Sequence, residues 1–277
     1  VSIAKLLYFW LIISRQERAK DVQVVSEGTA GINPETSYGL IFFTGSKMVL
    51  IGIAAMVVWH TDNLVISHFL GIEHVAAYSV TFRIFYVFFS MIAILNGAIL
   101  PLIAREMSIG NWEWINKVFS MLFKLMGLVG GLFWLGSVLF LRDFIIFWAG
   151  FDGYAGLLVL VVLGAYSYLM SMANLSAGVA MAMNYVNEVA WAGWLEAFVK
   201  IVSSILLLKV LHLAGVAMGT FLGSLAGPIV FLPLMLSRRK DNRLEYDTGF
   251  VIKHLLLVIF PFVAAAVLLQ IYVEVFS

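Results

Sequence analysis

The sequence predicts an all-α, polytopic membrane protein, that is, a bundle of membrane-spanning helices. Hydrophobic residues make up 62% of the 277 residues and charged residues 12%, whereas soluble domains are about half apolar and about a quarter charged. The mean hydropathy is +1.01. The apolar residues also gather in runs of about 20 residues or more, the length that an α-helix needs to cross a bilayer.

Taken in order, the apolar runs predict the end of one membrane helix and seven complete spans. Residues 1–14 are apolar but too few to span alone, so we expect the end of a truncated transmembrane helix there, followed by a polar linker over 15–37. The complete spans are predicted at about 38–59, 75–103, 118–141, 155–183, 190–210, 215–236 and 250–275. Between the third and fourth lies RDFIIFWAGFDGY, an aromatic-rich stretch typical of the membrane–water interface.

Lys and Arg are distributed unequally between the two sides of this predicted bundle. If the linker 15–37 is cytoplasmic, the opposite side holds Arg142 and Lys209. The cytoplasmic loops and flanks then hold Arg15, Arg18, Lys20, Arg105, Lys117, Arg238, Arg239, Lys240, Arg243 and Lys253. Because short cytoplasmic loops carry the excess of Lys and Arg, the linker 15–37 and the basic loop 237–249 are predicted to be cytoplasmic.

The second span carries an arginine, Arg83, about two turns from its start. An arginine at the centre of a bilayer costs roughly 2.5–3.5 kcal/mol on insertion scales, so its side chain must face protein or water. Its spacing from Ser79, Tyr86 and Ser90 places all four on one helix face. Since no opposite charge lies three or four residues away, Arg83 either lines a central cavity or bonds a carbonyl group or Asp62.

Other charges also fall within or at the edges of the spans. Lys47 and Lys124 could line the same cavity or extend to the membrane surface. Glu196 and Lys200 stand four residues apart and are predicted to pair on one helix face. Asp62, at the outer edge of its span, is a further coupling or structural charge. A cavity shared by several of these cations suits an anionic, phosphate-bearing substrate.

Small residues mark two further helix faces. The predicted span at 155–183 places Ser167, Ser171 and Asn174 on one face, which we expect to point into the bundle or the cavity. The glycines of the predicted span at 215–236 recur every four residues and form a ridge that lets another helix approach closely. They are Gly215, Gly219, Gly223 and Gly227.

The sequence predicts no catalytic residue, metal site or cofactor, and hence not an enzyme. It contains no cysteine, and no nucleotide-binding, dinucleotide-binding or zinc-protease motif occurs in it. The charges lie in loops rather than on one basic face, so no nucleic-acid partner is predicted.

The segment DNLVISHFLGIEHVAAYSVTFRI resembles the start of a lobe in the polysaccharide flippase branch of the multidrug/oligosaccharidyl-lipid/polysaccharide exporter superfamily. In that branch an Asp ends the first helix of the lobe and precedes an apolar stretch and LG. A Tyr-containing second helix follows and ends in a proline, here Pro101. The later IIFWAGFDGY and LLLKVLHLAGVAMGTFLGSLAG are similar as well, so the resemblance covers roughly residues 38–236.

The resemblance implies that 38–236 is a six-helix C-terminal lobe, the second of a two-lobe transporter with 6+6 helices, or 14 where a final pair is added. Residues 250–277 would then be an additional transmembrane helix. It implies a multi-pass protein of the inner membrane that flips a lipid-linked (polyprenyl-pyrophosphate) oligosaccharide across the lipid bilayer by alternating access, for O-antigen or other surface polysaccharide. Polysaccharide polymerase or ligase machinery would be its protein partner. The cationic cavity residues of the family correspond by position to Arg83 and, less closely, to Lys47.

Two alternatives stay open. A cation-coupled multidrug antiporter of the same superfamily would need a carboxylate on the cavity face, and Glu196 is the candidate. A membrane-embedded glycosyl- or acyltransferase of the cell envelope would need a long outer loop with paired carboxylates or Arg/His clusters, and the predicted outer loops are short.

Overall fold

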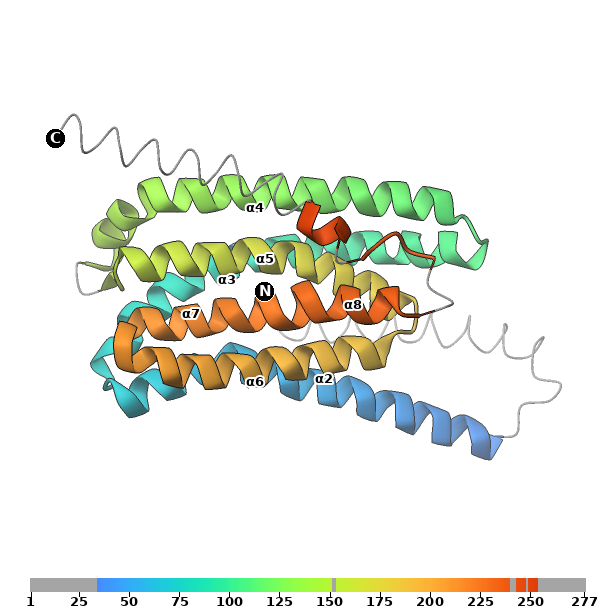
Figure 1. Ribbon diagram of the computed structural model, residues 1–277, viewed down its shortest axis with the longest axis horizontal. Helices are drawn as coiled ribbons and strands as arrows, with labels where there is room; N and C mark the ends of the chain where they lie inside the picture. The colour runs from blue at the N-terminus through green and yellow to red at the C-terminus, as the bar shows by residue number, and fades with distance from the viewer. Residues whose placement is uncertain (1–33, 151–152, 240–242, 248, 254–277) are drawn as a thin grey trace, which may run out of the picture. The chain divides into compact units, whose positions relative to one another are not determined.

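The computed structural model describes residues 34–150, 153–239, 243–247 and 249–253 (Figure 1). Most of these residues are helical and none forms a strand, which confirms the predicted all-α fold. The chain divides into two units, Val1–Ser46 and Lys47–Ser277. The described part of the first, residues 34–46, is helical, and the packing reported below is that of the second. The predicted helix end at 1–14 and the linker up to residue 33 lie outside the described residues.

The described helices follow one another with short connections. They are α2 (Pro34–Phe69), α3 (Glu73–Ser108), α4 (Trp112–Ala149), α5 (Leu157–Ala182), α6 (Val186–Leu211), α7 (Leu213–Ser224), the π-helical segment η2 (Leu225–Phe231) and α8 (Leu232–Ser237). The last three run on without a break. Pro228 lies inside η2, where its missing N–H and its ring interrupt the regular α-helical hydrogen bonds and favour the wider π turn.

Among the described residues, five helical stretches are long and apolar enough to cross a membrane. They are Met48–Phe69, Glu73–Ser108, Trp112–Ala149, Leu157–Ala182 and Leu213–Ser237. The predicted span 190–210 is also helical, as part of the 26-residue α6, which contains Glu196, Lys200 and Lys209 and is not among these five stretches. Of the predicted span 250–275, residues 250–253 are helical and the remainder lies outside the described residues.

Two helix ends differ from the prediction. α2 continues past Trp59 to Phe69, so Asp62 lies within a helix rather than at its outer edge. α4 continues to Ala149, so most of the aromatic stretch is the end of α4. The predicted spans end at the first polar residues after each apolar run. The helices themselves end close to glycines with left-handed backbone angles, Gly71 (φ 105°) and Gly150 (φ 78°).

α5 is the central helix of the second unit. It packs against α3, α4 and α7 (Figure 1) and is the most buried of the five apolar stretches. Ser167 and Ser171 are buried on it, which confirms that this face points into the bundle.

α6 and α7 form a tight hairpin because the glycine ridge, which continues from α7 into η2 at Gly227, faces α6. A Cβ atom added at Gly219 would lie 2.5 Å from the backbone nitrogen of Ser204 and 2.7 Å from its Cα. At Gly223 it would lie 2.7 Å from the carbonyl oxygen of Glu196, and at Gly227 it would lie 2.9 Å from the Glu196 Cβ. The predicted close approach is confirmed, and its partner is α6.

Replacing Gly219 by alanine should therefore destabilise the protein. We expect a loss of about 1–3 kcal/mol, because the added methyl group overlaps the Ser204 backbone and forces the two helices apart. Gly97→Ala on α3 is the matched control: nothing lies within 4 Å of its added Cβ, and helix propensity favours alanine by about 1 kcal/mol. Thermal unfolding of the purified variants measures both. Equal melting temperatures for the two variants would contradict the close approach.

Candidate functional site

A buried ion pair connects α2 to α6. The Lys200 Nζ lies 3.0 Å from the Asp62 Oδ1, and the two side chains are 1% and 4% exposed. Lys200 also donates a hydrogen bond to the carbonyl oxygen of Val58. The Asp62 carboxylate accepts hydrogen bonds from the hydroxyls of Tyr78 on α3 (2.8 Å) and Thr220 on α7 (3.1 Å). One carboxylate thus ties four helices together.

This pairing corrects the prediction that Lys200 would pair with Glu196. The described contacts of the Lys200 ammonium group are with Asp62 and Val58. Because Asp62 already has two hydroxyl donors, it is the better partner for a cation in a low-dielectric interior. Glu196 is 6% exposed, and its Oε1 is buried without a hydrogen-bond partner among the described residues.

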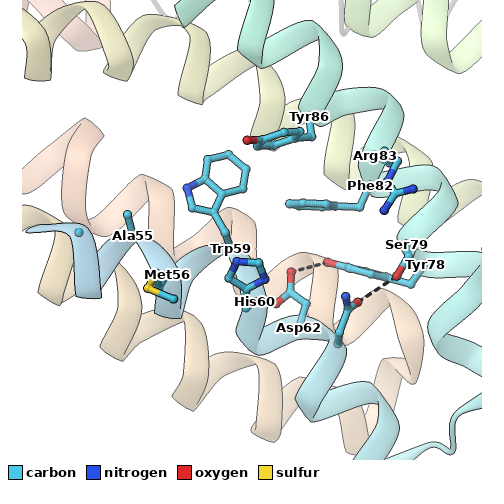
Figure 2. Close-up of a pocket in the computed structure, with 12 residues that line it drawn as sticks. Ala55, Met56, Trp59, His60, Asp62, Tyr78, Ser79, Phe82, Arg83 and Tyr86 are labelled. Atoms are coloured by element: carbon cyan, nitrogen blue, oxygen red, sulfur yellow. Dashed lines mark hydrogen bonds between the residues drawn. The ribbon is translucent and has the colours of Figure 1, made fainter. Parts of the chain in front are cut away.

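Arg83 is exposed on α3 and lines two cavities. The first, of about 450 Å³, lies between α2 and α3 and is shown in Figure 2. The second, of about 360 Å³, runs along α3 and reaches Trp148 near the end of α4. Within the described part of the chain, no carboxylate forms an ion pair with Arg83.

The cavity of about 450 Å³ has a polar end and an aromatic end. At the polar end Asp62 and Tyr78 are hydrogen-bonded, and the Ser79 hydroxyl donates to the Oδ1 of Asn63 at 3.1 Å. At the other end the ring of Trp59 lies edge-on to that of Tyr86, with centroids 5.0 Å apart. Its remaining lining residues are Gly52, Ala55, Met56, His60, Phe82 and Arg83 (Figure 2).

The ion pair decides the charge of this cavity. Asp62 is part of the lining, but its negative charge is balanced by Lys200. The guanidinium of Arg83 carries a positive charge, and no described carboxylate forms an ion pair with it. The arrangement therefore presents an uncompensated cation to whatever enters, which favours an anion.

The structure brings three of the predicted lining residues together, namely Ser79, Arg83 and Tyr86. Ser90 lies outside both Arg83 cavities and donates its hydroxyl hydrogen to the Val87 carbonyl at 2.7 Å. Helical spacing placed it on the right face, but seven residues along α3 correspond to about 10 Å, which carries it past the cavity.

The other predicted residues lie elsewhere. Asn174 on α5 accepts a hydrogen bond from the Nδ2 of Asn96 at 2.9 Å and lines a different cavity together with Glu196. Lys124 is exposed on α4 and is not part of either Arg83 cavity. Lys47 belongs to α2, but its side chain lies outside the described residues, so its role stays a prediction.

Sequence reasoning missed Tyr78 and Thr220 as partners of Asp62, and Trp59 as part of the cavity wall. Tyr78 has a signal that could have been used: if α2 is extended to Phe69 and a three-residue turn follows, Asp62 and Tyr78 fall one to two turns from the same end of a helix hairpin. No sequence signal points to Thr220, because its place beside Asp62 depends on how α7 packs against α6.

Removing the cation of the buried pair should be strongly destabilising. We expect Lys200→Met to cost about 3–5 kcal/mol, because it leaves the Asp62 carboxylate buried without a counter-charge. The double variant Asp62→Asn, Lys200→Met should recover most of this loss, since an amide retains hydrogen-bonding capacity without the charge. Denaturant or thermal unfolding of the two variants measures the difference. A single variant as stable as the unmodified protein would show that the pair is dispensable.

Comparison with known proteins supports a transport role for the region that contains this site. Residues 48–150, from the second unit's part of α2 to the end of α4, match the family model MatE. No curated protein and no solved structure matches the chain. The matched residues include Asp62, Tyr78 and Arg83. The match covers less than half of the chain, and over this segment it agrees with the expected multidrug/oligosaccharidyl-lipid/polysaccharide exporter superfamily.

Proposed function

We propose that the protein flips a lipid-linked, pyrophosphate-bearing oligosaccharide across the inner membrane for surface polysaccharide synthesis, and that Arg83 binds the anionic head group. The observation that carries this proposal is an exposed arginine on an apolar helix, with no ion-pair partner among the described residues, at the junction of two cavities. A transport function is also what the MatE match indicates.

Placing the Arg83 guanidinium within a membrane-spanning helix costs free energy unless an anion or water contacts it. Intramembrane arginines are expensive and mark substrate or ion pathways. The planar guanidinium can hold two phosphate oxygens at once and keeps its charge when water is excluded. With Asp62 engaged by Lys200, a phosphate at Arg83 meets no free carboxylate from the described cavity wall.

The two cavities differ in a way that suits an amphipathic cargo. The first has hydroxyl, amide and imidazole groups from Ser79, Asn63 and His60, which can hydrogen-bond a sugar phosphate. The second is lined, apart from Ser79 and Arg83, by Ala76, Val80, Ile84, Val87 and Trp148, which suits hydrocarbon. Arg83 belongs to both, where the phosphate of a lipid-linked sugar would lie between its polar head and its apolar tail.

In this proposal the protein lowers the cost of moving the polar head across the bilayer while the polyprenyl tail stays in lipid. Alternating access would expose the Arg83 cavity first to one side and then to the other, in concert with a further lobe. Polysaccharide polymerase or ligase machinery would receive the flipped product. Neither step requires a catalytic residue.

A cation-coupled multidrug antiporter is the second candidate. Two observations favour it: the matched model is MatE, and Glu196 is a buried carboxylate beside a cavity. The aromatic wall formed by Trp59, Phe82 and Tyr86 could also stack against a flat organic cation. Arg83 opposes this alternative, because its charge repels cationic drugs from the same cavity.

The Arg83→Ala substitution in the full-length protein should abolish export of surface polysaccharide at normal protein levels. Arg83→Lys should restore part of it, because an ammonium keeps the charge but loses the planar pair of donors. Arg105→Ala is the matched control, since Arg105 is also exposed on α3 but lies in its last turn and should leave export unchanged.

Export assays with immunoblotting of the three variants decide the matter. Full export by the Arg83→Ala variant would eliminate Arg83 as the anion site. Normal export together with lost resistance to a cationic drug would favour the antiporter.

A further inference from the structure

Trp59 lies on α2 at the same depth in the cavity of about 450 Å³ as Arg83 on α3. The two helices form a hairpin and run antiparallel, and the Ser79 hydroxyl, which donates to the Asn63 Oδ1 at 3.1 Å, marks their register. Going back four residues from Asn63 to Trp59, and on four residues from Ser79 to Arg83, gives the same shift of about 6 Å along each helix. Both side chains line the cavity between the two helices (Figure 2).

The indole ring of Trp59 forms part of the cavity wall and is not enclosed in the core. The residue is only partly buried, and Figure 2 shows the ring reaching from α2 toward Tyr86. The ring centroids of Phe82, Tyr86 and Phe89 on α3 lie 5.9, 5.0 and 5.2 Å from that of Trp59. These contacts support the ring from α3, while the ring also borders a separate cavity of about 150 Å³.

The indole N–H of Trp59 has no hydrogen-bond partner among the described residues. Trp134 on α4 differs, because its Nε1 donates to the carbonyl oxygen of Val161 at 3.0 Å. A tryptophan N–H that is buried by the fold usually finds such a partner. Trp59 therefore offers the cavity both an aromatic ring and an unused donor.

A sugar ring complements this wall. Each ring carbon of a sugar bears oxygen, so its C–H groups carry partial positive charge and pack favourably against the negative face of an aromatic ring. The hydroxyl groups project from the edge of the sugar and need hydrogen bonds. The Asn63 oxygen accepts from Ser79, which leaves the two amide N–H donors of Asn63, one turn from Trp59, for such hydroxyls.

We propose that Trp59 is a specificity-determining residue of the Arg83 cavity. Its ring stacks on a sugar ring of the cargo, and its N–H and the Asn63 amide donate to sugar hydroxyls. This inference rests on the proposed function, because the sugar is held beside the phosphate that Arg83 binds. It selects glycosylated prenyl pyrophosphates over the bare lipid. A flat organic cation would use the ring face alone and leave these donors unpaired.

Two probes with the same lipid test the proposal: farnesyl pyrophosphate, and farnesyl pyrophosphate that carries N-acetylglucosamine on its terminal phosphate. Titration calorimetry measures their binding to the full-length protein in nanodiscs. The sugar should tighten binding about three- to tenfold, the range expected for one aromatic contact. Trp59→Leu should lose this gain, since leucine is apolar but has no ring, and Trp59→Phe should keep part of it.

Trp191→Ala is the matched control. Trp191 is 65% exposed on α6 and lines neither Arg83 cavity, so its removal should preserve the whole gain. Arg83→Ala should weaken the binding of both probes equally, which separates the two claims. If neither probe binds the unmodified protein, the proposed function and this inference are both wrong. If both bind and Trp59→Leu keeps the full gain, this inference alone is overturned.

Saturation-transfer NMR gives a second readout that does not depend on how a variant folds. Irradiation of the aromatic protons of the unmodified protein should transfer saturation to the C–H protons of the bound N-acetylglucosamine. The Trp59→Leu variant should lose most of this transfer and the Trp191→Ala variant none of it. Absence of transfer to the sugar in the unmodified protein would contradict the stacking.

Discussion

The buried ion pair between Asp62 and Lys200 is the interaction on which the arrangement of the second unit depends. It joins α2 to α6, and the hydroxyls of Tyr78 and Thr220 bring α3 and α7 to the same carboxylate. The glycine ridge of α7 makes this geometry possible, because it lets α7 approach the α6 backbone closely enough for both helices to reach Asp62. The close packing of α7 on α6 and the buried ion pair therefore depend on each other at Asp62.

The same ion pair shapes the candidate binding surface. The Asp62 carboxylate lines the first cavity, but its charge is balanced by Lys200 of α6. The electrostatic field in the cavity therefore depends mainly on Arg83 of α3. Arg83 also borders an apolar cavity that reaches Trp148, and this places the cation between a polar and an apolar compartment. Glu196 forms no ion pair with Lys200, and its buried Oε1 has no hydrogen-bond partner among the described residues. Within the described part of the chain, the Asp62–Lys200 pair thus accounts for an arginine and a glutamate that are not ion-paired with either of its members.

Much of this could be predicted from the sequence, and the failures have physical reasons. Runs of apolar residues predicted the helices, and four-residue glycine spacing predicted the ridge, because both depend on the chain's own periodicity. The position of Arg83 on a polar stripe with Ser79 and Tyr86 followed in the same way. The partner of Lys200 could not be predicted in this way. The rule that oppositely charged residues four apart on a helix pair favoured Glu196, whereas the observed partner, Asp62, is 138 positions away on α2. Contacts between helices distant in sequence depend on packing that periodicity does not encode.

The central claim is that position 83 faces a polar, water-accessible cavity rather than lipid, and labelling of an introduced cysteine tests it most directly. The chain contains no cysteine, so Arg83→Cys and Leu95→Cys each provide a single thiol. Leu95 is 54% exposed on the same helix but is rotated by about 120° around its axis. A membrane-impermeant, negatively charged thiol reagent should label the Arg83→Cys variant and leave the Leu95→Cys variant unlabelled in reconstituted membranes. Protection of Arg83→Cys equal to that of Leu95→Cys would contradict the account.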